Sequence, residues 1–449
     1  MKCLFDRLLT SQVSDSLWIS NILGVIDTTR LIQVLSSIDS SSLQGKRVAI
    51  GKLPVLEFVC ALTFLDGLAK EIVFLPTEDD VKTREARLSM AEIDIVVEDN
   101  FFDFTKMLSS SENNGSYYSS QLGAVARNKS IQTKWLLPTS GTTGTPKLIS
   151  HTFASLTRGM THHAIGGNYI WASLYSLRRF AGLQVFLQAW MCETPFILTE
   201  EGADISDALT SFINGGCNSL SATPSMWRKL AMHPLFDRLN FKQITLGGEI
   251  VDQTVLDMLT TQFPASRITQ IYASTETGVG FIVRDGIAGF PLEYLLNPPL
   301  GIAMRIDNQN HLWFRSTADF SNLTAAESDW IDSGDVVELQ SDRVRFLGRA
   351  NGSINVGGNK VMPEEIESVI NELPEVAFVQ VRARKSAMLG SLVEASITPM
   401  PGIILDGAFK KRVIAHCSYR LAEYKVPAFI VMADTIQLNV TGKLSRNII

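Results

Sequence analysis

Short apolar runs separated by amphipathic segments fill the first half of the chain. Residues 47–50, 71–75 and 93–97 have the length and composition of buried strands, and residues 55–68 and 85–91 between them have helical patterns. Because strands alternate with helices, the pattern predicts a parallel, doubly wound sheet. Residues 1–45 are expected to be helical and irregular, and the polar residues 109–121 to form a loop.

The same alternation continues to about residue 277. Further strands are expected at 134–137, 172–175, 195–198, 218–222, 244–249 and 268–272, and helices at 151–163 and 183–190. Thr223 followed by Pro224, and later Asp252, are typical of helix starts, because hydroxyl and carboxylate side chains cap helices and proline suits the first turn.

The pattern changes after residue 297. Alternating runs at 303–306, 311–314, 336–339 and 344–347 follow one another without helices, which predicts an antiparallel sheet or small barrel. Residues 348–352 interrupt this pattern and are the predicted boundary between domains 1–349 and 350–449. The last hundred residues predict a small α+β domain, with helices from Pro363 and Asp406 and strands at 376–381, 392–397 and 428–432.

The composition narrows the class of protein. Hydrophobic residues make up 45% and charged residues 19% of the 449 residues, and the net charge of −6 gives no electrostatic footprint for nucleic acid. The five cysteines have no paired spacing, which argues against a disulfide framework or zinc site. The N-terminus has no signal-peptide pattern, and the longest apolar run, 58–65, is too short to span a membrane. These features favour a cytoplasmic enzyme.

Residues 139–147, Thr-Ser-Gly-Thr-Thr-Gly-Thr-Pro-Lys, concentrate hydroxyl groups, glycine and one lysine. Backbone N–H groups and hydroxyls of such a loop can donate to phosphate oxygens while the lysine supplies a positive charge. A plain surface loop between a strand and a helix explains the same composition, and the stretch alone leaves both interpretations open.

Four further stretches decide between them. They are 272–276 (Tyr-Ala-Ser-Thr-Glu), 333–335 (Ser-Gly-Asp) with Gly348-Arg349, 357–367 (Gly-Gly-Asn-Lys-Val-Met-Pro-Glu-Glu-Ile-Glu) and 439–443 (Asn-Val-Thr-Gly-Lys). Together and in this order the five stretches resemble the acyl-adenylate-forming superfamily, which includes acyl- and aryl-CoA ligases, adenylation domains of peptide synthetases, and luciferases. The resemblance covers about residues 135–449. Before residue 130 only the general α/β character matches.

The resemblance implies a reaction between a carboxylic acid and ATP that gives an acyl-adenylate and pyrophosphate. Lys443 would bridge the carboxylate and the α-phosphate, Thr275 would bind the α-phosphate, and Lys147 the outer phosphates. Glu276, with Thr142, would hold Mg²⁺. Asp335 would accept the two ribose hydroxyls, beside Arg349. The other nucleotide-contacting residues implied are Thr139, Ser140, Gly141, Thr143, Gly144, Gly248, Glu249, Tyr272, Ala273 and Ser274.

A second step is implied, in which a mobile C-terminal domain swings and a thiol of CoA or of a carrier-protein phosphopantetheine attacks the adenylate. Asn351 stands where the hinge residue, commonly an acid, would lie. Gly357 and Gly358 would let the pantetheine arm pass close to the backbone. A simple β-turn explains this glycine pair equally well.

The acid-binding pocket is expected around Arg178, Arg179, Phe180, Gly182, Leu183, Thr223, Gly247 and Ala273. Many ligases carry an aromatic-histidine pair where Arg178-Arg179 stands, and Ala273 replaces a usual glycine. An arginine here can neutralise a second polar group of the substrate, or pair with a local acid. We favour local pairing for Arg178 and leave Arg179 open.

The predicted fold is therefore α/β: a large N-terminal domain of doubly wound sheets with a small barrel-like subdomain, and a small α+β C-terminal domain. The predicted function is AMP-forming ligation of a carboxylic acid to CoA or an acyl or aryl carrier protein. Two alternatives stay open: an amino-acid adenylation enzyme, and a non-catalytic nucleotide-binding protein.

Overall fold

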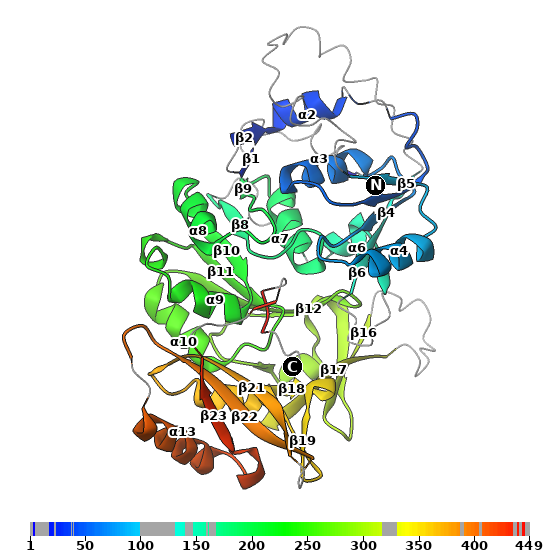
Figure 1. The fold of residues 1–449 in the computed structure, drawn as a ribbon. Coiled ribbons are helices and arrows are strands. Elements are labelled where there is room, and N and C mark those ends of the chain that lie inside the picture. The colour runs from blue at the N-terminus through cyan, green and yellow to red at the C-terminus, as the bar shows by residue number, and fades with distance from the viewer. Residues whose placement is uncertain are drawn as a thin grey trace. The chain divides into compact units, whose positions relative to one another are not determined.

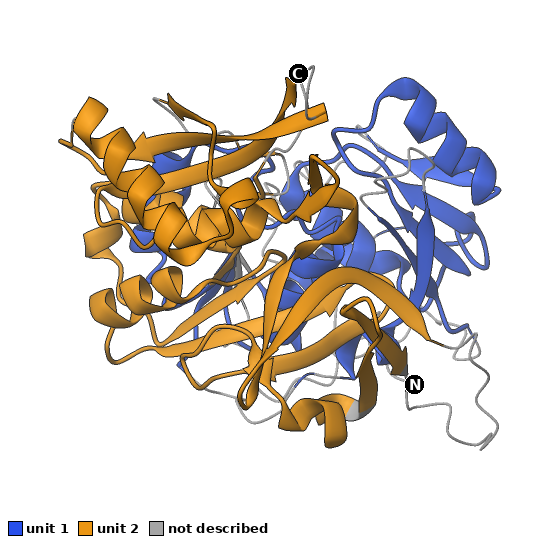
Figure 2. Cartoon of the chain, turned by 90° about the horizontal axis from the view of Figure 1, so that it is seen from below, with its two compact units in different colours: residues 1–220 blue, residues 221–449 orange. Residues whose placement is uncertain are grey.

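A computed structural model of the chain describes residues 3–4, 18–21, 24–36, 38, 40–98, 131–139, 147–158, 160, 168–316, 330–386, 390–403, 406–433, 438–439 and 442–444 (Figure 1). By its internal contacts the chain divides into two compact units, residues 1–220 and 221–449 (coloured separately in Figure 2). The predicted loop at 109–121 lies outside the described residues.

One sheet of the first unit has the strand order β5-β3-β4-β6-β7. β3 (Arg47–Ile50), β4 (Glu71–Phe74), β5 (Ile95–Val97) and β6 (Lys134–Pro138) are parallel, as predicted. Helices α3 (Val55–Leu65) and α4 (Val81–Met90) connect them, and the Asp80 carboxylate caps α4 by accepting from the Thr83 N–H. The predicted start of α4 at residue 85 is therefore four residues late, because Asp80 already serves as the cap.

The prediction of a helix over 151–163 is wrong at its start. Residues Leu148–Thr152 form strand β7, which pairs antiparallel with β6. The helix α6 (Phe153–Thr157) begins only after Thr152, whose hydroxyl accepts from the Ser155 N–H while the Ser155 hydroxyl accepts from the Thr152 N–H. This reciprocal cap fixes Thr152 in extended backbone, so no helical turn can include it.

The rest of the first unit has a second run of strands. β1 (Trp18–Asn21) pairs antiparallel with β2 (Gly24–Asp27) and parallel with β9 (Phe196–Ile197), which pairs parallel with β8 (Trp171–Ser173). The expectation of helical and irregular structure before residue 45 missed β1 and β2, although helix α2 (Thr28–Ser36) follows them. The unit also contains α7 (Phe180–Met191) and α8 (Ile205–Asn214), and β10 (Ser219–Ala222) spans the junction between the units.

The second unit begins with alternating helices and strands. α9 (Pro224–Ala231) and α10 (Gln253–Gln262) start at the predicted caps Thr223 and Asp252. β11 (Gln243–Gly247) and β12 (Arg267–Ser274) are parallel, and β13 (Gly278–Val283) returns antiparallel to β12. A short 3₁₀ turn, η1 (Phe236–Arg238), lies between α9 and β11.

An antiparallel sheet of order β14-β18-β17-β16-β15 follows, as predicted. Its strands are β14 (Phe290–Pro291), β15 (Ile302–Ile306), β16 (His311–Ser316), β17 (Ile331–Gln340) and β18 (Arg343–Arg349), with α11 (Glu293–Leu296) and η2 (Pro299–Gly301) before β15. Its core includes Phe281, Phe290, Leu312, Phe314 and Val337.

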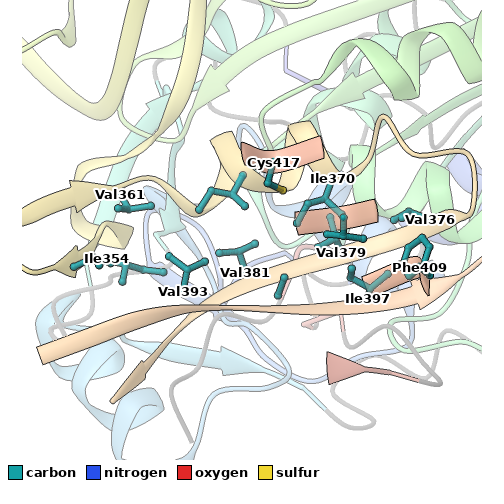
Figure 3. Close-up of a cluster of buried hydrophobic side chains, with 14 residues drawn as sticks. Ile354, Val361, Ile370, Val376, Val379, Val381, Val393, Ile397, Phe409 and Cys417 are labelled. Atoms are coloured by element: carbon teal, nitrogen blue, oxygen red, sulfur yellow. The ribbon is translucent and has the colours of Figure 1, made fainter. Parts of the chain in front are cut away.

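The described residues between 350 and 432 form a sheet, with two helices packed on it and a core of its own (Figure 3). Strands β19 (Ile354–Val356), β20 (Asn359–Val361), β21 (Val376–Ser386), β22 (Gly390–Pro399) and β23 (Phe429–Met432) make the sheet. α12 (Pro363–Ile370) and α13 (Gly407–Arg420) pack on it through buried Ile366, Ile370, Phe409, Val413 and Cys417. Turns η4 (Ala350–Gly352) and η5 (Glu423–Lys425) complete this α+β region. The domain boundary at 349/350 stays a prediction. Within the described part of the chain, every helix is too short or too polar to cross a bilayer.

Candidate active site

The predicted phosphate loop is the connection of a β-hairpin. β6 and β7 pair antiparallel up to Pro138 and Leu148, and the Thr139 N–H donates to the Lys147 carbonyl at 3.1 Å. The loop thus joins two strands, not a strand and a helix. Its central residues, Ser140, Gly141, Thr142, Thr143 and Gly144 among them, lie outside the described residues. The structure shows that Thr139 and Lys147 stand together at the two ends of the loop.

Asp335 is the centre of the cluster in the second unit. It lies in β17 with only 4% of its surface exposed. One carboxylate oxygen accepts from the Tyr272 hydroxyl at 2.6 Å, and the other accepts from Arg349 Nε at 3.1 Å. The Asp335 N–H donates to the Ser333 hydroxyl at 3.1 Å. The carboxylate is held on both sides by protein side chains.

Three phenylalanine rings fix the Tyr272 side chain. Its ring is stacked on Phe281, Phe314 and Phe346 with centroid separations of 5.1, 5.0 and 5.4 Å. The sequence analysis missed these three residues. Phe314 and Phe346 lie in predicted strands, whereas Phe281 lies in β13, which was not predicted, and nothing in their spacing indicates that they meet around one tyrosine.

Burial and neighbouring charges shift the pKa of Asp335 in opposite directions. Burial raises the pKa of Asp335 above its ordinary value, although Arg349, the Tyr272 hydroxyl and Lys443 each pull the pKa down. Burial and the neighbouring Asp335 carboxylate hold the pKa of Tyr272 well above its usual range, so its hydroxyl stays a proton donor. The Lys443 charge is close enough to act on Asp335, which links the residue expected at the α-phosphate with the residue expected at the adjoining ribose.

The loop after β12 carries the next predicted residues. β12 has an irregularity at Tyr272/Ala273, and the Ser274 hydroxyl lies 2.9 Å from the Thr277 hydroxyl and accepts from the Thr277 N–H at 3.1 Å. This turn leaves Glu276 exposed, and its charge acts on Arg349. Thr275 is half-buried beside it.

Lys443 lies in a hairpin closed by Asn439. The Asn439 N–H donates to the Lys443 carbonyl at 2.7 Å, and the Lys443 N–H donates to the Asn439 side-chain oxygen at 3.1 Å. Leu438 and Leu444 form an isolated β-bridge around this pair. The short spacing of Asn and Lys in the motif is the sequence feature that permits this turn.

The turn after β11 faces this hairpin. Gly247 ends β11, and Gly248 follows with φ +80°. A β-carbon at position 248 would lie 3.5 Å from Lys443 Cε and 3.7 Å from Thr223 Cγ2. The Glu249 carboxylate accepts from the Leu444 N–H at 2.9 Å. Gly248 and Glu249 therefore lie against the lysine hairpin in this structure.

The second glycine pair forms a two-residue turn. Val356 and Asn359 pair across it, Gly357 and Gly358 have φ +56° and +91°, and the Gly358 N–H donates to the Asn355 side-chain oxygen at 3.0 Å. Positive φ at both positions is a local reason for glycine, as the β-turn alternative proposed. Asn351 is exposed in η4, outside the left-handed backbone region.

The first unit holds the remaining pocket candidates. Arg178 is 2% exposed, donates to the carbonyls of Gly51 and Leu53 at 2.8 Å each, lies 3.6 Å from Glu201 and covers the Phe58 ring. Every one of these contacts belongs to the protein itself, which favours the local-pairing interpretation.

The residues that follow Arg178 in the sequence also contact other residues of the protein. Arg179 forms an ion pair with Glu78. Phe180 and Leu183 are buried, and a β-carbon at Gly182 would lie 2.2 Å from the Ser176 carbonyl oxygen, so packing alone requires glycine there. A pocket role for these residues stays a prediction.

Comparison with protein families gives two matches. Residues 65–306 match the model described as AMP-binding enzyme, and residues 365–443 match the AMP-binding enzyme C-terminal domain. The chain is 26% identical over 419 residues to surfactin synthase subunit 1 of Bacillus subtilis (strain 168), covering 83% of this chain and 11% of that protein. It is 24% identical over 340 residues to 2-succinylbenzoate–CoA ligase of Listeria innocua, covering 70% of this chain and 69% of that protein.

Solved structures share the fold. The anthranilate CoA ligase AuaEII in complex with anthranoyl-AMP has a TM-score of 0.78 at 16% identity, covering 99% of this chain and 95% of that one. A benzoate CoA ligase from Burkholderia xenovorans LB400 has a TM-score of 0.75 at 16% identity, covering 99% of both chains. The predicted α/β fold class, with a large N-terminal part and a C-terminal domain, is confirmed.

Proposed function

Because the chain belongs to the AMP-binding enzyme family, we propose that it is an ATP-dependent, AMP-forming acid–thiol ligase. The substrate carboxylate oxygen would form a bond to the α-phosphorus of ATP while the bond to the pyrophosphate oxygen breaks. A thiol would then attack the carbonyl carbon of the acyl- or aryl-adenylate and release AMP.

The observation that carries this proposal is the buried carboxylate of Asp335. It is fixed by Tyr272 and Arg349, and it lies within the electrostatic reach of Lys443. A carboxylate has two acceptor oxygens with about four lone-pair sites, so it can accept ribose hydroxyls while it keeps these two bonds. The cluster fits a nucleoside, and Arg349 places a positive charge beside it.

Lys443 would act where negative charge grows. A lysine placed at the carboxylate and α-phosphate orients both anions and stabilises the phosphorus centre during attack. The hairpin of Asn439 and Lys443 presents this side chain on a fixed backbone. No enzyme nucleophile is required, because the substrate supplies it.

The outer phosphates would be bound by the hairpin connection that runs from Thr139 to Lys147. Its hydroxyls and N–H groups suit phosphate oxygens. The exposed carboxylate of Glu276 offers the oxygen ligand that Mg²⁺ prefers, and the Thr142 hydroxyl is the second proposed ligand. Bound Mg²⁺ would neutralise phosphate charge.

For the second step we propose CoA as the thiol. The alternative is the phosphopantetheine thiol of a carrier protein. The turn of Gly357 and Gly358 exposes backbone without side chains, which suits close passage of a pantetheine arm. Asn351, in the exposed turn η4, is the proposed hinge.

The acid would be recognised near Gly247, Ala273 and the residues after Arg178. One of the reported relatives and both reported structural neighbours are ligases of aromatic acids: 2-succinylbenzoate, anthranilate and benzoate. We therefore propose an aryl acid as the first substrate class. Arg179, rather than the buried Arg178, is the arginine that can turn toward a polar substituent by leaving Glu78.

The test is ATP–pyrophosphate exchange with the full chain, Mg²⁺ and a panel of aryl, alkyl and amino acids. Exchange with aryl or alkyl acids, followed by thioester formation with CoA, supports the proposal. Exchange with amino acids alone establishes the adenylation-enzyme alternative. ATP binding by calorimetry without exchange for any acid establishes the non-catalytic nucleotide-binding alternative.

A further inference from the structure

Side chains at the start of helix α9 hold the chain on both sides of Lys443. The Thr223 hydroxyl donates to the carbonyl of Gly442, the residue before the lysine. The Glu249 carboxylate accepts from the N–H of Leu444, the residue after it, at 2.9 Å. Lys443 is thus suspended between two attachment points that are two residues apart.

The same two side chains are fixed by the helix itself. The Thr223 hydroxyl accepts from the Met226 N–H at 3.0 Å, and the second Glu249 oxygen accepts from the Ser225 N–H at 3.0 Å. These N–H groups belong to the first turn of α9, where no intrahelical carbonyl can receive them. The helix therefore orients Thr223 and Glu249 whether or not the hairpin is docked.

Resting on the proposed function, we propose that Thr223 and Glu249 are positioning residues that dock the lysine hairpin for adenylate formation. We call this pair the α9 clasp. Neither residue needs to touch a substrate for this role, which differs from the acid-pocket role expected for Thr223 and the nucleotide role expected for Glu249. Both residues act through Lys443.

The strength of the clasp suits reversible docking. A hydrogen bond to a charged group contributes about tenfold to an equilibrium, and a neutral one somewhat less. If the C-terminal region must leave between the two steps, the attachments must hold the hairpin yet release it. Two hydrogen bonds to the backbone meet both conditions, because water can replace each of them at modest cost.

The first readout is hydrogen exchange of the Leu444 amide in the full-length chain, because it requires no substrate. Glu249→Gln keeps the side-chain shape and removes the charge, and we expect the Leu444 amide to exchange about tenfold faster. Thr223→Val should have a similar effect, and Thr223→Ser, which keeps the hydroxyl, should not. Glu338→Gln removes an exposed carboxylate on β17 and serves as the control. Asp80→Ala removes the cap of α4 and controls for loss of a helix cap alone.

The second readout is a double-mutant cycle on pyrophosphate exchange with benzoate as the first probe acid. Glu249→Gln should lower kcat about tenfold with the KM for ATP unchanged, because the ribose cluster stays intact. In the Lys443→Ala background the same substitution should have no further effect, since nothing remains to position. If Glu249 has a merely structural role, Glu249→Gln should lower the rate by the same factor in the unmodified protein and in Lys443→Ala.

Three outcomes overturn the clasp: unchanged exchange of the Leu444 amide, an undiminished effect of Glu249→Gln in the Lys443→Ala background, or a raised KM for ATP as the main effect. Failure of the proposed function is a separate result. Suppose that the unmodified chain catalyses no ATP–pyrophosphate exchange with any acid of the panel while Glu249→Gln still speeds hydrogen exchange of the Leu444 amide. In that case the docking contact stands and the catalytic assignment falls.

Discussion

Asp335 and Lys443 are charged residues expected to serve one substrate, and the chain holds them in opposite ways. Asp335 lies within a ten-residue strand, 4% exposed, beside a tyrosine packed among three phenylalanine rings. Lys443 lies in a short hairpin whose contacts with α9 and the turn after β11 include two hydrogen bonds and the packing of the lysine side chain near Gly248. One residue is built into a core, and the other is docked onto a surface.

The difference separates binding from chemistry. A residue that binds the nucleoside has to stay in place through both steps, and burial within a sheet fixes its position. The same burial removes water from the ionised carboxylate, which costs free energy. A residue that stabilises one transition state is needed only in that step. The two kinds of attachment therefore predict different responses to substitution. A change at Asp335 should raise the KM for ATP, and a change at Lys443 should lower kcat.

The largest effect is expected for Lys443→Ala. Loss of a donor aimed at developing charge lowers the rate of adenylate formation by about 10²–10³-fold. The KM for ATP should change little, because the Asp335 cluster is untouched. Pyrophosphate exchange measures the rate, and calorimetry measures ATP binding. Lys425→Ala, which removes an ion pair with Glu365 elsewhere in the C-terminal region, is the control. A normal rate in Lys443→Ala would remove the contrast between the two residues.

Asp335→Asn should act on the other side of the comparison. We expect the KM for ATP to rise about 30-fold, because a charged acceptor of the ribose hydroxyls becomes a neutral amide. Stability should not fall. The raised pKa of Asp335 means that its ionisation costs folding free energy above that pKa, and the amide removes this cost. Thermal unfolding of both proteins at neutral pH checks the second point. A large drop in Tm with an unchanged KM would make Asp335 a structural residue.

Much of the local structure could be predicted from the sequence, because its causes are local. Thr223-Pro224 and Asp252 start helices through their own side chains, and the buried strands β3 and β4 read as apolar runs. The errors arose where a cap or a distant partner decided the outcome. The reciprocal cap at Thr152 keeps β7 extended, and β1 exists because residue Ile19 pairs with Phe196.

The site follows the same division. The order of motifs indicated Asp335, Arg349, Glu276 and Lys443, since each motif has a local chemical character. The contacts that orient them join distant positions: Thr223 and Gly442 are 219 residues apart, and Glu249 and Leu444 are 195 apart. No spacing rule within one sequence reports such pairs. For this reason the contact of the Glu249 carboxylate with the hairpin could not be predicted, and the role of Glu249 at the nucleotide stays a prediction.

Gly248→Ala should have an intermediate effect on the rate, because it disturbs the docking of Lys443. At φ +80° an alanine is strained by about 1–2 kcal/mol. The turn can relieve this strain by shifting Glu249, so we expect adenylate formation to fall about tenfold in kcat. Gly202→Ala, at φ +77° with no atom within 4 Å of the added carbon, carries the same strain away from the site. Equal losses of stability with unequal losses of rate would support the assignment; equal losses of both would contradict it.

The smallest effect is expected for Tyr272→Phe. Its hydroxyl is one of the groups that lower the pKa of Asp335 against the effect of burial. Without it the carboxyl takes up a proton at higher pH, and a protonated Asp335 offers one acceptor fewer to the ribose. We expect kcat/KM for ATP to fall about fivefold at neutral pH, and its acid limb to move to higher pH than in the unmodified chain. Tyr294→Phe, which loses a hydrogen bond to the Ile282 carbonyl, is the matched control. An acid limb that stays in place would show that the titrating group lies elsewhere, and the ribose assignment of Asp335 would fall with it.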